Sequence, residues 1–273
     1  MILGFIGCGA MGGAILKGLL KKQYMPTDNI YITTHDFKLT EKIADDLKVT
    51  PCKTNIELAE KCDVIILAVK PFAITSVIKE IEHVLINKKP IVVSIAAGTS
   101  IEKIYGDNAN AYPLIRVMPN IGARLSISTT ALFGSKTVND EQIKIVQNIF
   151  NQVGTTTVLE HEKQFSAFVG ISGSSPAFTF MFIEGMAKAA NEYGIDKKTA
   201  LKISSNAVKG ASILVEDALK NGLSVGQLID ELCTAGGTTI SGLLAAEEYG
   251  LSNAIIKAVS ATTEKDQTLN KEN

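Results

Sequence analysis

The feature that most constrains the fold is a glycine-rich segment directly after the first apolar run of the chain. Residues 2–6 read Ile-Leu-Gly-Phe-Ile, and the next six residues are Gly7-Cys8-Gly9-Ala10-Met11-Gly12. Glycines at this spacing permit a tight turn, the approach of a phosphate to the backbone, and close packing of a helix on a strand. A helix that begins here adds unpaired N–H donors for an anion. The segment predicts a strand–loop–helix unit that binds the pyrophosphate of a dinucleotide, and the alternative is a plain Gly-rich turn.

Short β-rich runs alternate with helical patterns up to about residue 160. We expect strands at Ile2–Ile6, Ile30–Thr33, Val64–Val69, Ile91–Ala96, Leu114–Met118, Thr129–Phe133 and Thr155–Leu159, and helices at about 10–18, 37–47, 56–61, 72–86 and 139–152. The Val64–Val69 run is apolar at every position, which suits a strand buried on both faces. The alternation predicts an α/β domain over residues 1–160, an N-terminal Rossmann-like doubly wound sheet with parallel strands.

From residue 161 to 273 the pattern contains no convincing strand and predicts an all-α domain. Helices are expected at about 197–219, 224–233, 239–249 and 251–268. Before them, Ser175 is a plausible N-cap, Pro176 fits the first helical position, and Gly194 is a C-terminal stop signal. Residues 177–183 are apolar on almost every side. We therefore expect that helix to be buried rather than half-solvated.

The end of the second expected strand bears on the choice of cofactor. NAD-binding sheets usually carry an acidic residue at this strand tip. Here the chain reads Thr33-Thr34-His35-Asp36, with no acid at the tip itself. The hydroxyls of Thr33 and Thr34, with His35 and Lys38 nearby, could receive a 2′-phosphate, which favours NADP and leaves NAD open. Asp36 is the opposing observation, since its carboxylate could turn inward and repel that phosphate, and His35 is equally compatible with a solvated loop position.

Three further strand ends carry residues suited to a ligand, because ligands of open α/β sheets lie beyond the carboxyl ends of the strands. Val69-Lys70-Pro71 follows the all-apolar strand, preceded by Ala68. The small residues Ala96-Ala97-Gly98 end the next strand and leave room for a flat ring. Pro119-Asn120 ends a third. Each of these segments alone is also typical of a turn that ends a strand. Three of them in succession after a phosphate loop indicate a cofactor site.

A second glycine-rich loop lies in the helical half. Thr234-Ala235-Gly236-Gly237-Thr238-Thr239 leads into the expected helix at 239–249. Paired glycines before a helix start form an anion nest, to which a hydroxyl can add a bond. Neither Thr238 nor Thr239 has Glu or Gln three residues later, so a capping box is absent and donors remain for an external carboxylate. Ordinary N-capping by one of the two threonines is the alternative.

Composition excludes several classes of protein. The net charge of -1 builds no basic field for nucleic acid or an anionic membrane. We find no signal peptide, and no apolar run that approaches the roughly 20 residues of a membrane-spanning helix. The four cysteines form no Cys-x-x-Cys pair and only three histidines are present. A metal site or a disulfide framework is therefore not expected, and a reduced cytoplasmic setting fits best.

Taken together, these segments resemble pyrroline-5-carboxylate reductases. The resemblance rests on Gly236-Gly237-Thr238-Thr239 and, in the family's order, on Val69-Lys70-Pro71, Ala96-Ala97-Gly98, Arg116-Val117-Met118-Pro119-Asn120 and Ser172-Gly173-Ser174-Ser175-Pro176-Ala177. It extends from the first strand to about residue 268. It implies NAD(P)H-dependent reduction of 1-pyrroline-5-carboxylate, a small cyclic imino acid, to proline. It also implies a helical dimerisation domain, so that the chain forms at least a homodimer, with a decamer of dimers left open.

The resemblance also implies roles for particular residues. Thr239 would face the ring nitrogen of the substrate as the catalytic residue. Thr234 and the N–H groups of Gly237 and Thr238 would hold the substrate carboxylate. Asn55 would lie near the adenosine ribose, and the residues around the nicotinamide would be Lys70, Ala96, Pro119 and Asn120. His35 stands where NADP-using members often carry Arg.

Two other functions remain open from the sequence alone. One is a hydroxyacid dehydrogenase of the same two-domain plan, since Lys202 and Asn206 have the spacing of that family's catalytic pair, although its Gly-rich lead-in is missing. The other is a non-catalytic dinucleotide-binding regulatory protein. Retention of the Gly236–Thr239 nest argues against it, because a sensor has no need of a carboxylate site.

Overall fold

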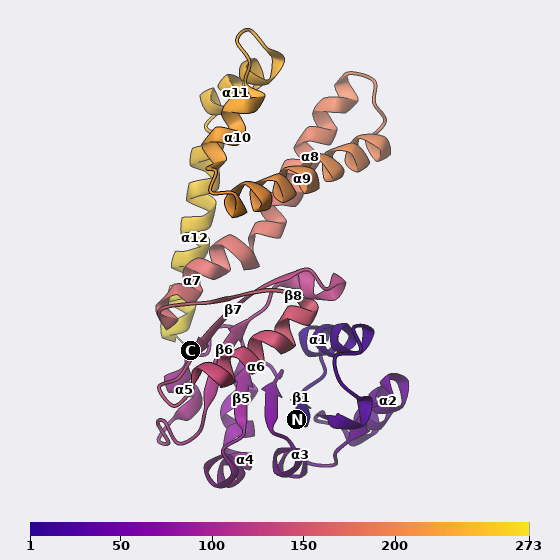
Figure 1. Ribbon diagram of the computed structural model, residues 1–273, viewed down its shortest axis with the longest axis vertical. Coiled ribbons are helices and arrows are strands. Elements are labelled where there is room, and N and C mark those ends of the chain that lie inside the picture. The colour runs from indigo at the N-terminus through magenta and orange to yellow at the C-terminus, as the bar shows by residue number, and fades with distance from the viewer. Residues whose placement is uncertain (273) are drawn as a thin grey trace. The chain divides into compact units, whose positions relative to one another are not determined.

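The computed structural model describes residues 1–272, with side chains through residue 269. The chain divides into two compact units. The first comprises Met1–Gly173 together with the chain from Thr263 onward, and the second is Ser174–Thr262. Each unit is described separately below (Figure 1).

The first unit contains one eight-stranded sheet in the order β3-β2-β1-β4-β5-β6-β7-β8. The strands are β1 Leu3–Ile6, β2 Ile30–Thr33, β3 Thr50–Pro51, β4 Val64–Leu67, β5 Ile91–Ser94, β6 Leu114–Met118, β7 Ser128–Gly134 and β8 Gly154–Val158. Its α-helices are α1 Ala10–Lys21, α2 Phe37–Leu47, α3 Asn55–Lys61, α4 Ile74–Lys88, α5 Ile101–Tyr105, α6 Asp140–Phe150 and α7 Phe165–Phe168. Shorter 3₁₀ turns are η1 Thr27–Asn29, η2 Pro71–Ala73, η3 Ile121–Leu125, η4 Asn151–Val153 and η5 Glu162–Gln164, and a π-helical turn, η6, spans Val169–Gly173.

The expected α/β fold is confirmed, and two details differ from the sequence prediction. β6 and β7 are antiparallel, whereas the other neighbouring strands are parallel. Only residues 119–127 connect β6 to β7, and this is shorter than the crossover that a parallel pair requires. The elements β3, α5 and α7 were not predicted, since each is too short to show a period.

Both faces of the sheet are covered, which explains the continuous apolar runs of its central strands. On one face, α1 and α6 pack on Phe5, Ile66 and Val93. On the other face, α3, α4 and α5 pack on Ile65, Leu67 and Val92. Because strand residues alternate between faces, a strand such as β4 must be apolar throughout.

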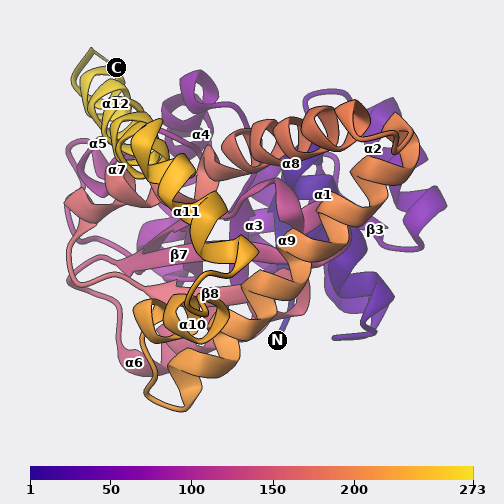
Figure 2. The same cartoon turned by 90° about the horizontal axis from the view of Figure 1, so that it is seen from above.

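The second unit is entirely helical in its described residues and includes α8 Ser175–Glu192, α9 Lys197–Lys220, α10 Val225–Leu232, α11 Thr238–Glu248 and most of α12 Leu251–Glu272. α8 and α9 lie side by side as a helical hairpin (Figure 2). Gly194 follows α8 with a φ of +86°, which confirms the predicted stop. The start differs by one residue: Ser175 is the first helical residue, Ser174 is the N-cap, and Pro176 still lies in the first turn, where its missing N–H costs no bond.

The prediction that α8 is buried is wrong for the single chain. Ala187 is its one buried residue, whereas Phe180 is 65% and Met181 77% exposed. The helical stretch Glu162–Glu192 is also long and apolar enough to cross a membrane by length and composition, contrary to the expectation that no such run exists. Several large apolar side chains exposed on one helix indicate a contact with another molecule.

Candidate functional site

The phosphate loop lies between β1 and α1, next to the end of β4. Gly7 has a φ of +94°, and its N–H donates to the carbonyl of Thr33 at 2.9 Å. A Cβ on Gly7 would lie 2.7 Å from the Ala68 carbonyl oxygen, and one on Gly12 2.7 Å from the Ala68 Cβ. The loop is therefore packed against the start of the β4–η2 connection, and only glycine fits at these two positions.

The outer side of this loop is open and carries unpaired helix donors. A Cβ on Gly9 would meet no atom within 4 Å. Gly9 is the N-cap of α1, no side chain caps this helix, and its first turn has no acidic residue. An anion can therefore approach backbone N–H groups at the positive end of the helix, as a dinucleotide pyrophosphate requires. Cys8, within the loop, carries a neutral thiol, because burial raises its pKa to about 12.

The tip of β2 is tied to α3 and α4 by side-chain hydrogen bonds. The buried Thr33 hydroxyl donates to Asn55 Oδ1 at 2.7 Å, and Asn55 Nδ2 donates to Glu80 Oε2 at 2.7 Å. The orientation of the Asn55 amide is thereby fixed. Asn55 and the strand tip thus lie together at the carboxyl edge of the sheet.

The turn after β2 uses its polar groups locally. Asp36 is the N-cap of α2 and accepts from the Lys38 N–H at 2.9 Å. Its carboxylate is engaged in that cap. The Thr34 hydroxyl donates to the Asp36 carbonyl at 2.8 Å, and His35 is exposed.

The ends of β4, β5 and β6 meet at the same edge because these strands are neighbours and parallel. Lys70 and Pro71 are exposed, Ala96 and Pro119 are buried, and Gly98 turns the chain with a φ of +68°. Small or rigid backbone at adjacent strand ends leaves a surface on which a planar ring can lie.

The Asn120 side chain is fully occupied by the protein. Its Oδ1 accepts from the N–H of Gly122 at 3.0 Å and of Thr129 at 3.3 Å. Its Nδ2 donates to the carbonyl of Ser172 at 3.1 Å and to the Ser172 hydroxyl at 3.2 Å. Asn120 therefore links the end of β6 to η6, and its amide has no donor left for a ligand.

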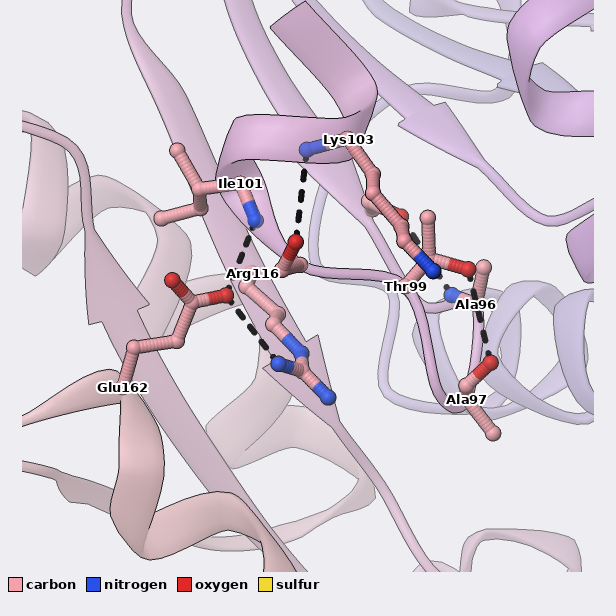
Figure 3. A network of polar contacts seen from close by, with 9 residues as sticks. Ala96, Ala97, Thr99, Ile101, Lys103, Arg116 and Glu162 are labelled. Atoms are coloured by element: carbon pink, nitrogen blue, oxygen red, sulfur yellow. Dashed lines mark hydrogen bonds and ion pairs between the residues drawn. The ribbon is translucent and has the colours of Figure 1, made fainter. Parts of the chain in front are cut away.

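Sequence reasoning missed an ion pair between a buried arginine and a partly buried glutamate. Arg116 of β6 is 4% exposed and pairs with Glu162 at 3.0 Å (Figure 3). Arg116 entered the sequence argument only as part of a motif, and Glu162 did not enter it. A charged residue inside an apolar strand, Leu114–Met118, is the signal that could have found the pair.

In the second unit, the glycine loop before α11 is formed as an open helix start. Gly236 has a φ of +71°, and Gly237 is the N-cap with no side-chain capping bond. The alternative in which Thr238 or Thr239 caps the helix is therefore wrong. Both threonines are exposed in the first turn, and the Gly237 N–H donates to the Thr234 carbonyl at 3.0 Å. The turn presents hydroxyls and uncapped N–H groups that suit a carboxylate.

Comparison with known proteins agrees with this arrangement. Residues 162–269 match a family model described as pyrroline-5-carboxylate reductase dimerisation, and residues 2–98 match one described as NADP oxidoreductase coenzyme F420-dependent. The pyrroline-5-carboxylate reductase of Escherichia coli K12 is 36% identical over 98% of both chains.

Two solved structures extend the comparison to the fold. A pyrroline-5-carboxylate reductase from Coxiella burnetii has a TM-score of 0.90 at 30% identity, covering 98% of this chain and 97% of that one. The Plasmodium falciparum pyrroline carboxylate reductase, solved with NADP bound, has a TM-score of 0.83 at 28% identity, covering 99% and 98%. A helix with a glycine N-cap follows a glycine-rich loop in each unit, and these relatives match almost the whole chain. The chain therefore belongs to the pyrroline-5-carboxylate reductase family.

Proposed function

We propose that this chain reduces 1-pyrroline-5-carboxylate to proline with a nicotinamide cofactor, for which NADP(H) is the better candidate and NAD(H) the alternative. The observation that carries the proposal is the uncapped start of α11, where exposed Thr238 and Thr239 follow a glycine N-cap. A cyclic imino acid offers this turn a carboxylate next to a ring nitrogen. The fold alone would not choose the substrate.

The phosphate loop is the proposed anchor of the cofactor. The open backbone at Gly9 and the uncapped start of α1 would hold the pyrophosphate. Asn55 would contact the adenosine ribose, and the exposed His35 would receive the 2′-phosphate of NADP next to Thr34, whose hydroxyl is held by the Asp36 carbonyl. The capping role of Asp36 supports NADP, since it gives that carboxylate a partner in its own helix.

The ends of the central strands would hold the nicotinamide. Lys70, Ala96 and Pro119 would border the ring, and Asn120 would act through the backbone that its side chain fixes. When bound, the cofactor supplies a hydride to the carbon of the C=N bond. The protein supplies orientation and exclusion of water, because a protonated imine is already electrophilic and needs little acid catalysis.

The substrate carboxylate would be held by Thr234 and by the N–H group of Thr238, while the Gly237 N–H, which donates to the Thr234 carbonyl, would keep the turn in shape. Thr239 would place its hydroxyl at the ring nitrogen, where it donates or relays a hydrogen bond. Neither the hydroxyacid-dehydrogenase alternative nor a non-catalytic regulatory role gives a function to this loop. NADPH oxidation with the cyclic imine, together with no reduction of NADP⁺ by 3-hydroxy acids, separates these possibilities.

We further propose that the active species is at least a homodimer, with larger rings of dimers possible, and that the protein is cytoplasmic. The exposed apolar side chains of α8 lie within the region that matches the dimerisation model, which favours a subunit contact over a lipid contact. The same match supports a functional domain boundary near residue 160. The four free cysteines fit a reducing compartment.

The test of this function is a substitution at Thr239. Thr239→Ala should lower kcat/KM for pyrroline-5-carboxylate by about 10–100-fold, the scale of a lost hydrogen-bond donor at a reacting centre. Thr239→Ser keeps the hydroxyl and should retain most of the activity. An unchanged kcat/KM in the alanine variant would remove Thr239 from the mechanism, and a wild-type protein that forms no proline would refute the function.

A further inference from the structure

Arg116 is a buried cation whose hydrogen-bonding groups are only partly satisfied. Its guanidinium carbon lies 4.3 Å from the centre of the Phe165 ring, and Nη1 bonds to Glu162 at 3.0 Å. Nε and Nη2 are buried and have no partner among the described residues. Arg116 is buried and Glu162 is partly buried, and burying a charge costs free energy before any Coulombic gain, so apolar residues are often as stable in such a place. A contribution to stability alone therefore gives little reason for the pair.

Glu162 joins three segments through one oxygen atom. Its Oε1 accepts from Arg116 Nη1 of β6 at 3.0 Å and from the Ile101 N–H at 2.8 Å (Figure 3). Ile101 is the first residue of α5 and directly follows the loop of residues 96–100. Glu162 itself begins η5. One carboxylate thus fixes β6, the start of α5 and η5 relative to one another.

The hydrogen bonds within the first part of the loop of residues 96–100 are long. The Thr99 hydroxyl donates to the Ala97 carbonyl at 3.4 Å, and the Ala96 N–H donates to Ser94 Oγ at 3.4 Å. Bonds of this length are weak. At the C-terminal end of the loop, Ser100 caps α5 by accepting from the N–H groups of Lys103 at 3.3 Å and Ile104 at 3.1 Å. The 2.8 Å bond from Ile101 to Glu162 is shorter than all of these, and it connects this end to a segment outside α5.

The same ion pair lies two residues before the end of β6. That strand continues through Val117 and Met118 into Pro119 and Asn120, and Asn120 bonds to Ser172 of η6 at 3.1 Å. The segment from Glu162 to Ser172 therefore bonds to this part of the chain at two places, to Arg116 within β6 and to Asn120 just after the strand ends. Both strand-end loops that would border the nicotinamide depend on this segment.

We infer that Arg116 and Glu162 are positioning residues, which set the Ala96–Gly98 loop and the Pro119–Asn120 strand end for the nicotinamide. This inference rests on the proposed function. The adenosine and pyrophosphate contacts lie at β1, β2 and α1, away from the pair, so its loss should impair turnover more than cofactor affinity. Misplacement of a reacting group by about 1 Å can cost about 100-fold in rate.

The experiment compares three variants of the full-length protein. Glu162→Ala removes the acceptor for both Arg116 and Ile101. Glu162→Gln keeps a neutral acceptor at the same place. The double variant Arg116→Met/Glu162→Leu replaces the pair with apolar side chains and leaves no buried charge unpaired. For each we would measure kcat, KM, the Kd of NADPH by fluorescence titration, the thermal midpoint, and hydrogen exchange of residues 96–101 without ligand.

We expect Glu162→Ala to lower kcat by about 10–100-fold while the Kd of NADPH changes less than about threefold. Glu162→Gln should lose only about threefold in kcat, since its oxygen still accepts both bonds. The double variant should recover the thermal midpoint but keep the low kcat and the fast hydrogen exchange of residues 96–101. If the alanine variant does not fold, the glutamine and double variants still decide the matter.

A kcat that recovers together with the thermal midpoint in the double variant would overturn the inference, as would unchanged hydrogen exchange at residues 96–101. So would a glutamine variant with wild-type kcat and an altered Kd for NADPH. Failure of the proposed function looks different: the wild type would form no proline, whereas hydrogen exchange in the ligand-free variants would still report whether Glu162 anchors the loop.

Discussion

The two glycine loops of this protein begin helices in the same manner but in different surroundings. α1 and α11 each have a glycine N-cap, no side-chain capping bond and no acidic residue in the first turn. The loop before α1 is wedged against β4, where added Cβ atoms at Gly7 and Gly12 would collide with Ala68. The loop before α11 is open, and a Cβ on Gly236 would meet nothing within 4 Å.

This difference shows that one chain can carry one anion-binding turn packed against a buried core and another that is exposed. The α1 loop is held by a sheet that is buried on both faces, so its N–H groups are in place before any ligand arrives. The α11 loop belongs to a unit whose large apolar side chains remain exposed in one chain.

The largest effect should come from Gly7→Ala. Its φ of +94° disfavours any side chain, and the new Cβ would lie 2.7 Å from the Ala68 carbonyl oxygen. We expect the free energy of unfolding to fall by about 2–3 kcal/mol. The displaced loop should also bind the pyrophosphate less well. The Kd of NADPH should rise about 10–100-fold, which is the scale of losing one charge-assisted hydrogen bond. Urea unfolding and fluorescence titration measure the two quantities.

Gly9→Ala is the matched control, because its Cβ meets no protein atom within 4 Å. Its unfolding free energy should stay within about 0.5 kcal/mol of the wild type. Its affinity for NADPH should nevertheless fall, since the methyl group occupies the open side from which a pyrophosphate would approach. Wild-type affinity in this variant would mean that the ligand does not lie there.

A smaller effect, on KM for the imine, is expected from a substitution at Gly237, because the new side chain would displace the neighbouring Thr234 hydroxyl. The φ of -75° suits any residue, but a Cβ would lie 2.6 Å from the Thr234 hydroxyl oxygen. Gly237→Ala should displace that hydroxyl and raise KM for the imine about 10-fold with the Kd of NADPH unchanged. Thr234→Ala should then cost less in the Gly237→Ala background than in the wild type.

Gly236→Ala provides the contrast in the same loop. It strains the backbone at a φ of +71° by about 1 kcal/mol but places its Cβ near no other atom. Thr234→Ala should therefore cost the same in this background as in the wild type. If Thr234→Ala changed KM by the same factor in both glycine-variant backgrounds, the effect of Gly237→Ala would not be transmitted through the Thr234 hydroxyl.

The sequence predicted the elements that have a clear period, and it was less successful where distant segments meet. β2, β6 and α2 were predicted with the bounds that the structure has, because apolar period and turn residues mark them locally. The antiparallel β6–β7 pair was missed, although the short connection could have indicated it. The exposure of α8 was missed because apolar composition does not distinguish a core from a subunit contact.

Within the site, local glycine patterns were more informative than side-chain partners. The phosphate loop and the α11 loop follow from residues adjacent in sequence. The Arg116–Glu162 pair and the Asn120–Ser172 bonds join residues far apart in the chain. No spacing rule relates such residues, so one sequence could not show that the Asn120 amide is already occupied.

The smallest expected effect concerns Cys8, which distinguishes the packed loop from an open one. Burial raises the pKa of this thiol from 9.0 to about 12. Both folded and unfolded chains therefore carry a neutral thiol below pH 9, and its contribution to stability is fully present there. As the pH rises above 9, the unfolded chain ionises first, and stability is lost progressively until about pH 12.

Cys8→Ala should remove this part of the pH dependence. Between pH 8 and pH 10 the wild type should lose about 1 kcal/mol more unfolding free energy than the variant, as measured by urea titration. The Kd of NADPH should not change with thiol ionisation below pH 9, since no thiolate forms beside the pyrophosphate. An identical pH profile for the two proteins would mean that water reaches Cys8, and that the α1 loop is as open as the loop before α11.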